Sequence, residues 1–237
     1  PKTIRHLKGE DLKDAIPDKL YIPLTDIRML TKVDLLMLEM LANCNWERPL
    51  YLAISVGSVS KLKFDNYFVQ EGLAFRFTPF DYKKWGDVGE NRLYAVDVER
   101  LYDNVMNRYK YGGLDTPGLY LDETTLRTCW YHRRLFAQLA KELIAQGDNE
   151  RAKKVLAYAE QVIPGYNVPE THESGSYDIA TAYAALGEKT KAVTLAVHLI
   201  AEAEDYINWA FSLKGNRIEM VRNDCIYKFW QWNQYNE

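Results

Sequence analysis

The spacing of apolar residues divides the chain into a first part with mixed strand and helix patterns and a second part that is helical. Between residues 26 and 42, apolar side chains recur every three or four positions, which predicts an amphipathic helix with Asp26 as its N-cap. Residues 50–56, LYLAISV, are apolar on both alternating faces and predict a fully buried strand, central to the fold. After residue 122 the strand pattern disappears and helical periodicity takes over.

The rest of the first part predicts a small α/β layer. A short helix is expected over residues 64–70, and strands over 73–80 and 93–98, with a polar loop between the strands. A helix over 98–109 then ends at Gly112 and Gly113, a pair that favours a left-handed stop. Helix, strand, helix, strand, strand and helix together indicate a sheet of about three strands.

The second part contains a repeated helical pattern. Its first copy has the tetratricopeptide spacing, with small residues where two helices cross and large residues between them: Phe136, Leu139, Ala140, Leu143, Gly147, Ala152, Leu156, Ala159 and Pro164. A weaker copy follows around Tyr183 and Gly187, with about six additional residues between the two copies. A last helix, from 218 to about 235, would cap the stack and has more aromatic residues than one buried stripe needs.

These patterns predict a mixed α+β fold in three parts. Residues 1–25 form an extended lead-in, residues 26–121 a small α/β domain, and residues 122–237 a tetratricopeptide-like helical region with a C-terminal capping helix.

Composition and charge narrow the class of protein. The net charge of −3 comes from interspersed residues of both signs, which excludes the basic footprint of a nucleic-acid binder. The longest uncharged run, residues 49–60, is shorter than the ~20 residues that cross a membrane. The chain begins with proline rather than methionine, so we expect a piece of a longer protein.

Motifs for catalysis or metal binding are missing from the sequence. No two of the four histidines have metal-ligand spacing, and the three cysteines form no CxxC pair. The GSVS segment after the predicted strand is neither a nucleophile elbow nor a phosphate-binding loop. We therefore predict no catalytic residue, no cofactor and no metal site.

Three places and one helical groove remain as candidates for ligand binding. An arginine just before the first predicted strand could bind an anion or hold a helix end. The loop 80–92 could offer an aromatic platform or fold onto the core, and the turn-rich segment 109–123 could hold a sugar hydroxyl or Ca²⁺. The groove of the helical repeats is the fourth. The candidate residues are Arg48, Tyr82, Trp85, Tyr111, Asp115, Asp122 and Tyr183.

Three stretches, occurring in order, resemble a known family. They are LANCNWERPLY at 41–51, YFVQEGLAFR at 67–76 and YDNVMNRYKYGGLDTPGLYLDE at 102–123, followed by the tetratricopeptide-like helices. They resemble the C-terminal soluble portion of the DUF2723 proteins of Bacteroidetes, relatives of the TMEM-type protein O-mannosyltransferases. The resemblance covers roughly residues 26–200.

The resemblance implies a polytopic membrane protein of glycosyltransferase-C-like architecture. Its catalytic acid would lie in the membrane part, outside this chain, and no catalytic residue of the family maps here. The portion in hand would lie on the extracytoplasmic, periplasmic side of the membrane, anchored by transmembrane segments outside the chain.

Three functions follow as alternatives. The first is an accessory domain, not itself an enzyme, that orients a polypeptide or glycan acceptor in the groove of residues 133–200. The second is a docking or self-association module for an envelope protein, acting through the aromatic C-terminal segment, which could also lie against a membrane surface. The third is an independent enzyme that uses the carboxylates of residues 109–123.

Overall fold

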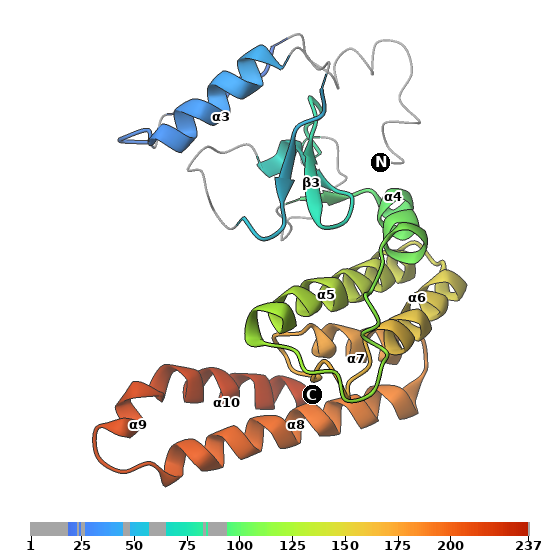
Figure 1. Ribbon diagram of the computed structural model, residues 1–237, viewed down its shortest axis with the longest axis vertical. Coiled ribbons are helices and arrows are strands. Elements are labelled where there is room, and N and C mark those ends of the chain that lie inside the picture. The colour runs from blue at the N-terminus through green and yellow to red at the C-terminus, as the bar shows by residue number, and fades with distance from the viewer. Residues whose placement is uncertain are drawn as a thin grey trace. The chain divides into compact units, whose positions relative to one another are not determined.

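A computed structural model describes residues 19–22, 24, 27–44, 48–56, 65–82, 84 and 94–236. The chain divides into two compact units, residues 1–107 and residues 108–237, which are treated separately below. The fold is mixed, as predicted, with a small sheet in the first unit and helices in the second (Figure 1).

The sheet of the first unit has four strands in the described residues, rather than about three. They are β1 (Tyr51–Ala53), β2 (Phe68–Gln70), β3 (Ala74–Phe77) and β4 (Ala95–Val96), in the order β1-β3-β2-β4. β3 pairs antiparallel with β1 and β2, whereas β4 pairs parallel with β2.

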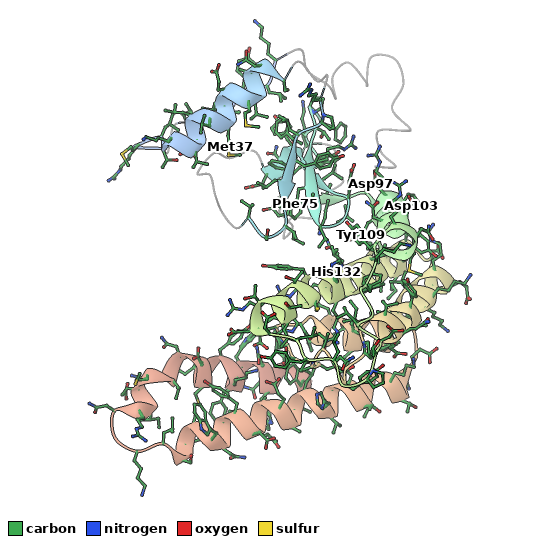
Figure 2. The ribbon with its side chains drawn as sticks, viewed as in Figure 1. Met37, Phe75, Asp97, Asp103, Tyr109 and His132 are labelled. Carbon is green, nitrogen blue, oxygen red and sulfur yellow. The ribbon has the colours of Figure 1, made fainter. Side chains whose placement is uncertain are left out.

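One face of this sheet packs against helix α3 (Lys32–Asn43). Phe68, Phe75 and Phe77 form the buried centre, and Met37 of α3 packs against them (Figure 2). The N-cap of α3 is Thr31, whose hydroxyl accepts a bond from the Asp34 N–H while the Asp34 carboxylate accepts one from the Thr31 N–H. The predicted N-cap, Asp26, lies outside the described residues.

Two sequence predictions for the sheet are wrong. The LYLAISV strand is the short edge strand β1, with Tyr51 51% exposed, and is neither fully buried nor central. The predicted helix over 64–70 is a 3₁₀ turn (Asp65–Tyr67) followed by the fully buried strand β2. Pairing on both sides by β3 and β4 satisfies the β2 backbone and overrides the local helix pattern.

A buried carboxylate links the sheet to the next helix, α4 (Val98–Asp103), which continues as a π-helical turn (Asn104–Arg108). Glu71, after β2, lies 2.6 Å from Arg76 Nε and 2.9 Å from Arg100 Nη1. The Asn104 side-chain amide donates to the Glu71 carbonyl at 2.6 Å. The hydrogen bond between Asn104 and Glu71 thus joins two of the segments that resemble the known family, 67–76 and 102–123.

The second unit consists of two helical hairpins and a C-terminal extension (Figure 1). α5 pairs with α6, α7 pairs with α8, and α5 also packs on α7. The helices are α5 (Glu123–Ala145), α6 (Asn149–Val162), α7 (Ser176–Ala185), α8 (Lys189–Ser212), α9 (Arg217–Met220) and α10 (Arg222–Asn236).

The two hairpins turn in the same way. Gly147 and Gly187 both have φ of +77°, the left-handed region that favours glycine. The following N–H groups, of Asp148 and Glu188, donate at 2.9 Å to the carbonyls of Leu143 and Tyr183. The two predicted copies therefore share the geometry of their turns. The additional residues lie in the segment between α6 and α7.

The C-terminal helix α10 packs antiparallel against α8 (Figure 1). It begins at Arg222 after the short helix α9, rather than running unbroken from residue 218. Several large apolar side chains here are 41–83% exposed: Trp209, Phe211, Met220, Ile226, Tyr227, Phe229 and Trp230. Among the described residues, no helix combines the length and the apolar character needed to cross a membrane.

Candidate functional site

A groove of about 360 Å³ opens between α6, α7 and α8 in the second unit. Its floor is apolar, with Leu156 and Ile163 on one side and Ile179 and Leu195 on the other. Charged and polar side chains line the rest, including Glu160, Lys191 and His198. An apolar floor with a few convergent polar groups is the usual composition of a ligand site.

Three side chains of the groove form one polar cluster. The Tyr183 hydroxyl donates to Glu160 Oε1 at 2.5 Å, and Lys191 Nζ donates to the two oxygens of Glu160 at 2.9 and 2.7 Å. Lys191 Nζ also lies 5.0 Å from the centroid of the Tyr183 ring. Burial, and then the bond to Glu160, raises the pKa of Tyr183. The phenol is thus neutral at physiological pH and acts as a donor.

Buried Arg133 supports one wall of the groove. Its guanidinium donates to the carbonyls of Ile163, Val168 and Pro169 and to the Ser174 hydroxyl, at 2.6–3.1 Å. Loss of hydration lowers its pKa to about 10. These bonds fix the irregular segment between α6 and α7.

Of the predicted ligand residues that the structure describes, only Tyr183 lines this groove. Tyr111 packs between His132, Phe136 and Tyr158, with ring centroids 5.5–6.0 Å away. Burial raises its pKa. Tyr109 also packs edge-on against His132 (Figure 2). Tyr111 therefore belongs to an aromatic cluster that anchors the start of the second unit.

The two candidate aspartates of segment 109–123 have no shared site. Asp122 is the N-cap of α5, and its Oδ1 accepts from the N–H groups of Thr124 and Thr125 at 2.9 and 3.2 Å. The bond from the Thr125 hydroxyl, and then these backbone bonds, lower the pKa of Asp122. Asp115 is exposed, and its backbone carbonyl accepts from the Tyr166 hydroxyl at 2.6 Å. The part of the chain that the structure describes holds no cluster suited to a metal ion.

The other three candidates lie in the first unit. Arg48 is exposed ahead of β1. Tyr82 is fully buried and packs edge-on against Phe80, with ring centroids 4.8 Å apart, so its ring belongs to the core. Trp85 lies outside the described residues. Of the predicted aromatic platform, the structure therefore places Tyr82, which is buried in the core.

Sequence reasoning did not single out Glu160, Lys191 or Arg133. Glu160 and Lys191 are 31 residues apart, and the charges on each helix resemble any solvated face. The available signal was positional. Glu160 lies one residue beyond Ala159 of the first copy, and Lys191 one residue before Ala192 of the second.

Fold and groove together define a small α+β unit joined to a unit of helical hairpins with a ligand-sized groove. Residues 3–99 match the family model described as TMEM260-associated domain 2. This match spans α3 and all four strands, and confirms for this part of the chain the relation to TMEM-type proteins that the motifs indicated. No curated protein and no solved structure matches the chain.

Proposed function

We propose that this chain is an extracytoplasmic accessory portion of a membrane-embedded, glycosyltransferase-like protein of the DUF2723 type, and is not itself an enzyme. In this proposal the helical unit is a tetratricopeptide-like stack that binds a polypeptide or glycan acceptor and presents it to the membrane part. The observation that carries the proposal is the groove between α6, α7 and α8, with its apolar floor and its Glu160–Lys191–Tyr183 cluster.

The chemistry of the groove suits a neutral polar ligand with an apolar portion. Glu160 and Lys191 neutralise each other, so the groove offers paired donors and acceptors rather than one net charge. A peptide amide or a sugar hydroxyl could replace part of this pairing, while the apolar floor accepts an aliphatic group or a sugar face. The match of residues 3–99 to a TMEM260-associated domain supports the connection to a membrane protein.

Amide chemical shifts measured during titration of the whole chain test the proposal. The probes are serine- and threonine-rich peptides and, separately, manno-oligosaccharides. Saturable shifts in residues 156–198 are expected. Lys191→Glu should abolish them, and the double exchange with Glu160→Lys should partly restore them. Lys153→Glu is the control, because Lys153 is a half-exposed partner of Glu188 outside the groove.

A second candidate function is docking of another envelope protein, or of a second copy, through the α8–α10 hairpin. Terminal helices of repeat stacks ordinarily have a polar outer face, yet Phe211, Met220 and Trp230 are 50–83% exposed here. Sedimentation velocity over a wide concentration range tests it. Self-association that Phe211→Ser weakens, together with no shift in the groove, would replace the acceptor proposal with this one.

A further inference from the structure

The first unit combines an open strand edge with an apolar groove. Leu50 and Ile54 make the hydrogen bonds at the two ends of the β1–β3 ladder. The Phe77 N–H donates to the Leu50 carbonyl, and the Ile54 N–H donates to the Leu73 carbonyl, both at 2.9 Å. Because an antiparallel ladder bonds every second residue, Tyr51 and Ala53 turn their backbone groups away from β3.

Within the described residues, this outer edge of β1 is unpaired. The Ala53 carbonyl accepts from the Val56 N–H at 3.0 Å, but the Tyr51 N–H, the Tyr51 carbonyl and the Ala53 N–H have no backbone partner. An unpaired, regular strand edge is a template onto which another extended chain can add by backbone hydrogen bonds.

The groove lies beside this edge, on the face of the sheet covered by α3. It measures about 250 Å³ and is lined by α3 and by residues of β1, β2 and β3. Every side chain of the described residues that line it is uncharged. Leu50 and Leu52 of the edge lie on this face, because they stand opposite Phe77 and Phe75 in the register.

Helix α3 has a second apolar stripe beyond the one that meets the core. Met29, just before the helix, and Val33, Leu36 and Met40 recur at helical spacing and are 41–69% exposed. Val33 and Met40 of this stripe also line the groove. A strand added outside β1 would direct every second side chain toward them, because side chains alternate between the faces of a sheet.

We propose that the β1 edge and the α3 groove form a docking site for an extended segment of a partner polypeptide, with uncharged apolar residues at alternating positions. The segment would join the sheet next to β1. Its apolar side chains would enter the groove, and its other side chains would lie beside Tyr51, whose hydroxyl is 3.3 Å from Glu71. The open backbone groups select an extended chain, and the uncharged lining selects apolar side chains. This site is separate from the groove of the helical unit, and its test does not depend on the function proposed there.

Fluorescence anisotropy of the whole chain with a labelled, end-capped peptide tests the site. The peptide alternates valine and threonine between terminal lysines, and the comparison peptide has glutamate at the valine positions. Saturable binding of the valine peptide is expected. The glutamate peptide should bind at least about tenfold more weakly, because its charges would lose their hydration in the groove.

Two variants separate backbone pairing from groove contact. Tyr51→Pro removes an outward N–H while the bonds of Leu50 and Ile54 to β3 remain, so binding should weaken by about tenfold or more. Met40→Glu, at a side chain 58% exposed, should weaken binding similarly without unfolding the chain. The control is Leu35→Glu, which is 54% exposed on α3 but outside the groove and should bind normally.

Several outcomes would overturn the proposal. Absence of saturable binding, equal binding of the glutamate peptide, or an equal loss in Leu35→Glu would each refute it. Dimerisation of the chain that Tyr51→Pro abolishes, without peptide binding, would assign the edge to a second copy of this chain instead. Thermal melting of each variant, followed by circular dichroism, verifies folding, and Met40→Glu decides the result if Tyr51→Pro does not fold.

Discussion

Arg133 provides the sharpest test of what holds the helical unit together. Its side chain is 3% exposed and donates four hydrogen bonds to the irregular segment between α6 and α7. Replacement by methionine, Arg133→Met, keeps most of the apolar volume and removes every donor. Three carbonyls and one hydroxyl then lose this charged partner in the interior.

The expected loss follows from two opposing quantities. Bonds from a charged donor contribute about 1.5–3 kcal/mol each, so four contribute about 6–12 kcal/mol. Against this, the fall of the Arg133 pKa from 12.5 to about 10 corresponds to a cost of about 3 kcal/mol for keeping the charge buried. The free energy of unfolding should therefore fall by at least about 3 kcal/mol, within the range known for breaking buried charged contacts.

Urea unfolding followed by far-ultraviolet circular dichroism measures this loss, because the helices of the second unit dominate the signal. The control is Arg127→Met on the same helix. Arg127 is 64% exposed and, among the residues that the structure describes, pairs with exposed Glu123 alone, so its removal should cost less than about 1 kcal/mol. A loss below about 1 kcal/mol for Arg133→Met would refute the reasoning, since it would mean that desolvation cancels the bonds.

Three further predictions concern backbone strain, pH and the buried ion pair. Gly175→Ala should lower stability by at least about 2 kcal/mol in urea unfolding, because φ is +86° and the new Cβ would lie 2.8 Å from a neighbouring side chain. Gly187→Ala, with φ of +77° and open space, should cost only about 1 kcal/mol, and equal losses would contradict the role of the contact. Burial lowers the pKa of His132 and His172 below 6.5, so the unfolded chain binds more protons, and melting temperature should fall as pH drops below that value. His132→Phe should flatten this dependence, and an unchanged slope would exclude His132 as its source. Glu71→Gln should cost about 2–4 kcal/mol by removing the carboxylate charge that faces Arg76 and Arg100, and a loss below about 1 kcal/mol in urea unfolding would show that the pairing is not stabilising.

Long helical periodicity was sufficient to predict most of the second unit. A repeat of apolar residues over several turns fixes which face of a helix is buried, and Gly147 and Gly187 mark the turns because they adopt positive φ. The N-cap position of Asp122 also follows from local chemistry, although the sequence analysis named that carboxylate only as a candidate for ligand binding. A short polar side chain at the start of a helix accepts hydrogen bonds from the free N–H groups of the first turn, and these bonds occupy the oxygen that a ligand would otherwise contact.

The short strands were predictable only in part. The strands β3 and β4 lie within predicted segments, but β1 and β2 exchanged roles relative to the prediction: the apolar run became the edge, and the presumed helix became a central strand. Runs of three or four residues carry too little periodicity to separate strand from helix. Which strand lies at the centre depends on partners that are far away in the sequence.

The class of the fold, the helical hairpins and their turns could be predicted from the sequence, because they depend on residues within a few turns of one another. Three arrangements became known from the folded chain: Glu160, Tyr183 and Lys191 share one groove, Arg133 supports its wall, and the outward backbone groups of Tyr51 lie at a sheet edge. These arrangements join positions tens of residues apart. No local pattern encodes such a meeting, since it is set by how whole elements pack and pair.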